Sequence, residues 1–83
     1  YEIWLNDNIH LEFNRKKEII DIDSKTKLPD SVIPAKILDY VMTKLPEQFI
    51  TDWSLDDKHQ EVELNNGLNI KFTKKGEFLR FDD

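Results

Sequence analysis

Apolar and polar residues alternate in several short stretches of the chain. In residues 1–5 and 9–13 every second side chain is apolar, which is the period of a half-buried β-strand. The same period recurs at residues 18–23, 49–55, 61–65, 68–73 and 77–82. Between residues 34 and 45 the apolar positions instead follow helical spacing. The pattern therefore predicts the order βββ-α-ββββ.

The predicted helix is amphipathic and bounded by prolines. Ile37, Leu38, Val41, Met42 and Leu45 form one apolar stripe. Pro34 is expected to occupy the first helical position, and Pro46 to end the helix. Strands that are joined by tight turns are antiparallel. We therefore predict an α+β fold, an antiparallel sheet of about seven strands with one helix packed on one face.

Residues 60–82 repeat the pattern of residues 1–23 at an offset of 59 positions. The identical residues are Glu2, Leu5, Asn6, Phe13, Lys16, Glu18 and Asp23, matching Glu61, Leu64, Asn65, Phe72, Lys75, Glu77 and Asp82. Such self-similarity predicts two copies of one sheet unit.

The turns of the two copies differ at two positions. A three-residue hairpin loop at residues 6–8 would place Asn8 in the left-handed conformation, where the second copy has Gly67. Lys17 stands where the second copy has Gly76. A positive φ at Lys17 would therefore strain the first turn.

Alternation also assigns side chains to the two faces of the sheet. The expected core positions include Ile20, Ile22, Leu79 and Phe81. Trp53 is also expected in the core, because it alternates in step with Phe49 and Leu55. The opposite face should carry Trp4, His10, Ile19, Phe78 and Arg80. Apolar and aromatic residues on a solvated face indicate either a partner-binding surface or burial under a further helix. We predict these five as partner-binding residues, and both alternatives stay open.

The composition excludes several classes of partner. A net charge of −5 argues against nucleic acid and against anionic membranes, since both need clustered basic residues. The sequence has no cysteine, so it offers no disulfide and no thiolate metal site. It also has no apolar run near the ~20 residues of a membrane span.

No candidate catalytic residue has the partner residues that catalysis requires. His10 and His59 have no partner at metal-binding spacing, and Ser24, Ser31 and Ser54 lie outside any nucleophile-elbow motif. We therefore expect no enzymatic activity and no cofactor.

Carboxylates gather at predicted strand ends, at Asp21, Asp23, Asp82 and Asp83. They could surround a hard cation such as Ca²⁺, although the sequence has no EF-hand-like loop. Charged ends that protect sheet edges are the commoner explanation of such residues.

The second half of the chain contains a distinctive set of motifs. They are V-I-P-A-K-I-L-D-Y-V at 32–41, Leu45-Pro46, E-V-E-L-N-N-G-L at 61–68, K-F-T-K-K-G-E-F-L at 71–79 and the final F-D-D at 81–83. With these motifs the sequence resembles the PepSY-like proteins of Bacteroidetes, whose fold is described as similar to the β-lactamase inhibitor protein. The resemblance implies a single domain, 1–83, in which 32–83 form one complete repeat and 1–23 the last three strands of another. The helix and first strand of that other repeat would lie upstream of Tyr1.

The resemblance also implies an exported protein, periplasmic or held at the cell surface as a lipoprotein. It brings no catalytic residues to this sequence. The expected function is a non-enzymatic extracytoplasmic protein-binding module, an inhibitory or accessory subunit of an envelope complex such as one at the outer membrane. The alternative is a module that responds to Ca²⁺ or to a small ligand.

Overall fold

The computed structural model describes residues 1–5 and 9–82. In these residues the element order is three strands, a short 3-10 helix, an α-helix and four strands. The elements are β1 (Glu2–Leu5), β2 (Ile9–Phe13), β3 (Ile19–Ser24), η1 (Asp30–Val32), α1 (Ala35–Lys44), β4 (Ile50–Leu55), β5 (His59–Leu64), β6 (Asn69–Thr73) and β7 (Phe78–Asp82). The predicted order βββ-α-ββββ is confirmed.

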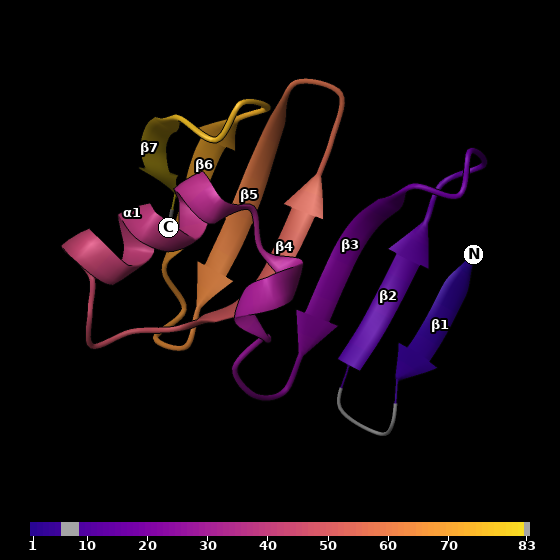
Figure 1. Ribbon diagram of the computed structural model, residues 1–83, viewed down its shortest axis with the longest axis horizontal. Coiled ribbons are helices and arrows are strands. Elements are labelled where there is room, and N and C mark those ends of the chain that lie inside the picture. Colours follow the sequence, from indigo (N-terminus) through magenta and orange to yellow (C-terminus); the bar gives the residue numbers. More distant parts are fainter. Residues whose placement is uncertain (6–8, 83) are drawn as a thin grey trace.

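The seven strands form one antiparallel sheet in sequence order, from β1 to β7. Figure 1 shows α1 in front of the β6–β7 end of this sheet, whereas no described helix lies in front of β1 and β2. The helix buries Ile37 and Val41 against the sheet. One face of the sheet is therefore covered at one end and left bare at the other.

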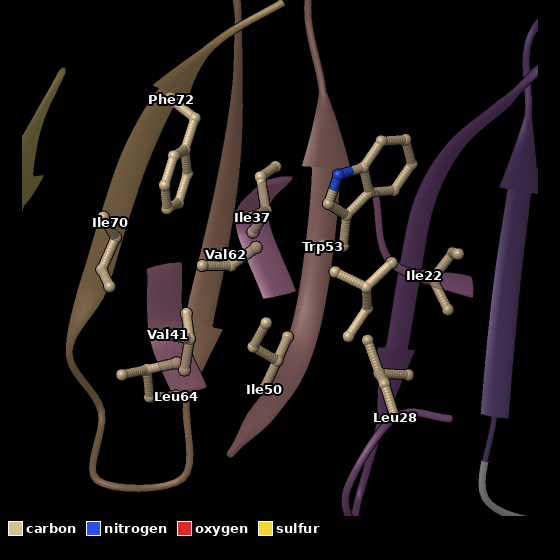
Figure 2. Packing of buried hydrophobic residues seen from close by; sticks show 11 residues of the cluster. Ile22, Leu28, Ile37, Val41, Ile50, Trp53, Val62, Leu64, Ile70 and Phe72 are labelled. Atoms are coloured by element: carbon tan, nitrogen blue, oxygen red, sulfur yellow. The ribbon is translucent and has the colours of Figure 1, made fainter. Parts of the chain in front are cut away.

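The strand register aligns the core residues in one continuous row. Directly paired residues Ile3, Leu11, Ile22, Trp53, Val62, Ile70 and Phe81 run across all seven strands. Cross-strand partners share a face, so this apolar row faces the helix side throughout. Its central members are buried, and Figure 2 shows Ile22, Trp53, Val62 and Ile70 together with the helix residues.

The connection from β3 to α1 contributes more to the core than its polar sequence predicts. Leu28 is fully buried and Ile33 nearly so. The backbone N–H of Leu28 donates to the carbonyl oxygen of Ile50 at 2.8 Å, which fixes the connection to the start of β4. This segment therefore packs on the sheet as part of the fold.

Three irregularities in the register change which residues face the core. They lie at Glu12/Phe13, Ile50/Asp52 and Lys71/Phe72. A β-bulge adds one residue to a strand and reverses the alternation beyond it. The predicted faces are consequently wrong on one side of each bulge.

The first and third bulges move Ile19 and Phe78 to the helix side. Ile19 pairs with Phe13 and Phe78 pairs with Phe72, so neither lies on the opposite face as predicted. The second bulge buries Ile50, while Phe49 is 36% exposed. Trp53 is buried, as predicted.

The helix also differs from its prediction in two details. Pro34 is the N-cap residue, and α1 starts one residue later, at Ala35. Met42 is 59% exposed, although the apolar stripe included it. Tyr40 contacts the sheet instead, stacking on Phe78 with ring centroids 4.9 Å apart and meeting Phe72 edge-on at 5.5 Å.

The one buried polar side chain among the described residues, Gln60, has all its groups hydrogen-bonded. The Trp53 Nε1–H donates to Gln60 Oε1 at 2.9 Å, and Gln60 Nε2 donates to the carbonyl oxygens of Thr73 and Lys74. A buried amide without such partners would destabilise the fold. This network ties β4 and β5 to the β6–β7 turn.

The two β-hairpin turns at the same end of the sheet have matching geometry. Lys17 has φ 67° and Gly76 has φ 92°, so the strain expected from a positive φ at Lys17 applies to the first turn. The N–H of each donates to a carbonyl three residues earlier, at Asn14 and Thr73. Gly67 also has a positive φ of 88°, whereas the prediction for Asn8 concerns residues outside those described.

Gly76 and Gly67 form a matched pair for testing the contact between α1 and the β6–β7 turn. A Cβ at Gly76 would meet the Lys36 Cβ at 3.0 Å, whereas a Cβ at Gly67 would meet nothing within 4 Å. Both alanine variants carry the same left-handed strain of roughly 1 kcal/mol. We expect Gly76→Ala to lower the unfolding free energy by about 1 kcal/mol more than Gly67→Ala. Urea denaturation of both variants measures the difference, and equal losses would contradict the contact.

Candidate functional site

The face of the sheet opposite α1, called the open face below, consists of two polar rows. In each strand, the residues just before and just after the member of the apolar row project from the opposite face of the sheet, and these residues form the two polar rows. One row is Glu2, Glu12, Asp21, Ser54, Glu61, Lys71 and Arg80. The other is Trp4, His10, Asp23, Asp52, Glu63, Asn69 and Asp82.

The open face holds the negative charge of the whole chain. Its two rows contain eight carboxylates and two basic residues, Lys71 and Arg80, which leaves six net negative charges with His10 neutral. The complete sequence has a net charge of −5, so all other residues together sum to +1. The charge is therefore a property of one surface and not of the average composition.

His10 joins the three N-terminal strands on this face. Its Nε2 lies 2.9 Å from Glu2 Oε1 on β1, and its Nδ1 lies 3.2 Å from Asp23 Oδ2 on β3. The Trp4 ring packs against the imidazole, with centroids 4.6 Å apart. The His10 side chain is 12% exposed, whereas Trp4 is 63% exposed. The cluster therefore fixes an aromatic ring that remains accessible to a partner.

The two carboxylates favour the charged imidazolium. The hydrogen bond to Asp23 raises the pKa of His10 above 6.5 most strongly, burial opposes the rise, and Glu2 adds to it. The folded pKa exceeds the unfolded one, so the stabilisation is complete below pH 6.5. It is lost as the pH rises through the folded pKa.

Acidic side chains meet in the centre of the open face, and His10 is the basic group beside Asp23. Asp23 lies directly opposite Asp52 on the adjacent strand, and Asp21 lies two residues from Asp23 on the same face. Burial, followed by the charges of Asp23, Glu12 and Asp52, raises the pKa of Asp21 to about 6. Burial also raises the pKa of Asp52. Asp21, Asp52 and Glu61 line a shallow groove of about 190 Å³.

The structure separates the five residues predicted to bind a partner. Trp4, His10 and Arg80 lie on the open face, but Trp4 and Arg80 belong to the two outermost strands. Ile19 and Phe78 lie on the helix side. The five residues therefore do not form one patch, and their partner-binding role stays a prediction.

The structure does not bring Asp23 and Asp82 together around a cation, which is the less common of the two explanations of these carboxylates. Both belong to one row, but four strand spacings, roughly 19 Å, separate β3 from β7. Asp82 instead lies 3.6 Å from the Lys71 Nζ, and Asp83 is outside the described residues. No group of three His, Asp or Glu side chains in residues 1–5 and 9–82 converges closely enough to hold a metal ion.

Sequence reasoning missed Asp52 and Glu63 as members of the open face. The regular register of β3 and β4 brings Asp52 opposite Asp23, and Glu63 lies opposite Asp52 on β5. Alternation alone assigned no role to Asp52 or Glu63. His59 hydrogen-bonds Asp56 at 2.9 Å in the β4–β5 turn. It is therefore not part of the His10 cluster.

This combination of features defines a class of protein. It is an α+β protein with one long antiparallel sheet, a helix at one end of one face, and an acidic opposite face. The profile of the family described as "Putative beta-lactamase-inhibitor-like, PepSY-like" matches residues 1–80. The chain therefore belongs to the PepSY-like family, as the sequence resemblance indicated.

Solved structures of Bacteroides proteins share this fold along the whole chain. Two are "putative" periplasmic proteins of Bacteroides vulgatus, one of them of unknown function, with TM-scores of 0.90 and 0.89 at 33% and 28% identity. A third, from Bacteroides thetaiotaomicron, is described as "a putative calcium-regulated periplasmic protein", with a TM-score of 0.91 at 32% identity. All of this chain is covered, but only 66–67% of each relative. The chain thus spans about two thirds of their length.

The relatives also agree on a location. All three are described as periplasmic, and the chain is accordingly an exported protein, as expected. None of the described helices has the length and apolar character needed to cross a membrane. A search of curated proteins found no match.

Asp21 provides a test of the electrostatics of the open face. Between pH 3.8 and about 6 the folded chain retains a proton that the unfolded chain releases, so stability falls across this window as the pH rises. We expect Asp21→Asn to raise Tm by about 2–4 °C at pH 7.5 and to leave it unchanged at pH 3. Thermal denaturation at both values measures this, with Asp57→Asn in the β4–β5 turn as control. An equal gain at both pH values would rule out repulsion as its cause.

Proposed function

We propose that this chain is a non-enzymatic extracytoplasmic module that binds a protein partner through the open face. The observation that carries the proposal is the concentration of charge, six net negative charges on two adjacent rows. Complementary charge accelerates and orients the docking of proteins. The partner is accordingly one that presents a basic surface.

Trp4 supplies a candidate anchor at the margin of this face. Its ring is largely exposed, while Glu2 and Asp23 hold the His10 ring that packs against it. A pre-positioned tryptophan loses little conformational entropy when a partner covers it. Tryptophan is also among the residues enriched at the centres of binding energy in interfaces.

A binding role fits the family more closely than an enzymatic one. The sequence contains no nucleophile–base motif, and the family is described by its likeness to an inhibitor fold. We extend the proposal to an inhibitory or accessory subunit of an envelope complex. Since the chain spans two thirds of its relatives, the division into a partial repeat at 1–23 and a complete one at 32–83 is part of the same proposal.

A calcium-responsive module is the second candidate. It is favoured by the direct opposition of Asp23 and Asp52 and by the calcium regulation stated for one relative. Like charges placed opposite each other are destabilising, and a bound divalent cation would relieve them. The described side chains do not form a three-ligand group, so a calcium site would require them to move.

The partner-binding proposal predicts a face-specific loss of binding. We expect Trp4→Ala to reduce recovery of the partner from the native envelope fraction by about tenfold, with Tm unchanged because Trp4 is exposed. Tyr1→Ala is the matched control, since Tyr1 is 71% exposed on the same edge but is paired with Phe13 on the helix side. Equal recovery by the Trp4→Ala variant and the unaltered chain would exclude the open face. Recovery should also fall as salt is added.

The calcium candidate predicts binding that depends on the central carboxylates. Titration of Ca²⁺ into chelator-treated protein should release or absorb heat and raise Tm, and Asp23→Asn with Asp52→Asn should abolish both effects. Asp56→Asn in the β4–β5 turn is the control for removal of a carboxylate elsewhere. Absence of heat and of a thermal shift at millimolar Ca²⁺ would remove this candidate.

A further inference from the structure

The last strand of the sheet, β7, is an edge strand with an apolar surface. It pairs with β6 on one side, and no described strand pairs with its other edge. It exposes three large apolar side chains, Phe78 at 40%, Leu79 at 43% and Phe81 at 48%. Natural proteins protect such edges with charged side chains, proline, β-bulges or a covering loop. Residues 78–82, F-L-R-F-D, have the charges of Arg80 and Asp82 and a bulge in the pairing with β6, yet the three apolar side chains stay exposed.

The chain itself shows what covers an equivalent edge. At the offset of 59 positions, Asp21, Ile22 and Asp23 of β3 correspond to Arg80, Phe81 and Asp82 of β7. The bulges beside the two strands correspond as well, at Glu12/Phe13 and Lys71/Phe72. The outer edge of β3 is occupied by β4, which pairs Trp53 with Ile22. Ile22 is consequently 2% exposed, whereas its counterpart Phe81 is 48% exposed.

On the helix side, Phe81 ends a chain of aromatic contacts that starts in the core. Phe72 is fully buried and lies 5.5 Å from Tyr40, whose ring stacks on Phe78 at 4.9 Å. Phe78 in turn meets Phe81 at 5.2 Å. An aromatic side chain on an added strand would lie opposite Phe81 and extend this cluster, as Trp53 extends the apolar row beside Ile22.

On the open face, the two neighbours of Phe81 have opposite charges. Arg80 and Asp82 flank it in sequence and both point away from α1. In an antiparallel added strand, the residue opposite Arg80 should therefore be acidic and the residue opposite Asp82 basic. Read along the added strand, the complementary pattern is basic, aromatic, acidic.

A single extended segment suits this edge better than a second whole copy. In Figure 1 α1 lies in front of the β6–β7 end of the sheet. A twofold axis perpendicular to the sheet at β7 would bring the α1 of a second copy to the same side, beside the first helix. A lone strand carries no such helix.

We propose that the outer edge of β7 binds an extended segment of a partner protein as an eighth, antiparallel strand, with a basic–aromatic–acidic triplet opposite Asp82, Phe81 and Arg80. Main-chain hydrogen bonds would supply affinity and the three side chains specificity, as in other cases of strand addition. This site is separate from the open-face surface around Trp4, because β1 and β7 are the two opposite edges of the sheet.

A peptide with a sequence derived from β4 tests the proposal. The probe is residues 49–55 with Asp52→Lys and Ser54→Glu, which places Trp53 opposite Phe81 in the register that β4 has on β3. The control peptide exchanges the two charges. Fluorescence anisotropy of labelled peptides gives affinities, and amide exchange with NMR locates the contact. We expect about fivefold tighter binding of the probe, with slowed exchange confined to β7.

Variants of the chain make the test specific. Arg80→Glu combined with Asp82→Lys should reverse the preference, so that the control peptide binds more tightly. That reversal also shows that the variant is folded. Phe81→Ser should weaken both peptides, and Trp4→Ala should affect neither. Perturbation of β1 in place of β7, or equal binding of both peptides, would overturn the proposal. A stable dimer would also overturn the proposal if Arg80→Asp and Asp82→Arg each disrupted it and a mixture of the two variants restored it. The occupant of the edge would then be a second copy of this chain.

Discussion

The structure depends on the alignment of one apolar residue per strand into a single row that faces α1. This row runs from Ile3 to Phe81 across all seven strands, and its buried members form one core cluster with Ile37 and Val41. Because side chains alternate with a period of two, the positions on either side must project to the other face. Burial of one row thus fixes the positions of the two polar rows of the open face. Stability and the candidate function therefore have a common geometric origin.

β-Bulges keep this alignment while allowing the strands to end differently. Each of the three bulges inserts one residue into a strand. Apolar residues on both sides of the bulge can therefore face α1, although they are not separated by an even number of positions. At β7 the bulge returns Phe78 to the helix side, where Tyr40 stacks on it. The bulge in the β4–β5 pairing likewise places Ile50 on the helix side, where it is buried.

The two ends of the helix side differ in their cover. Val62, Ile70 and Phe72 are buried beneath α1, whereas Ile3, at the position equivalent to Val62, is 45% exposed. A groove lined by Tyr1, Ile3 and Phe13 lies at this end. The charged face, by contrast, is continuous from β1 to β7. The asymmetry therefore concerns the apolar layer alone, and the relatives, which are half as long again, share the complete sheet of this chain.

The kinds of element, their order and the family could be inferred from the amino-acid sequence alone. Period-two and helical spacing are local signals of burial, and the prolines at 34 and 46 and the glycines at 67 and 76 are local signals of backbone geometry. Strain at Lys17 could be foreseen because the repeat aligns Lys17 with Gly76, and two matching turns have the same backbone conformation.

Only the tertiary structure decided the bulges, the faces of Ile19 and Phe78, the burial of Leu28 and the meeting of Asp23 with Asp52. The position of a bulge depends on how a strand fits its neighbours. The alternation of apolar and polar residues on either side of it is equally compatible with a strand that has no bulge. The acidic centre likewise joins residues that are far apart in sequence. Their proximity follows from the register between strands, which local alternation does not contain.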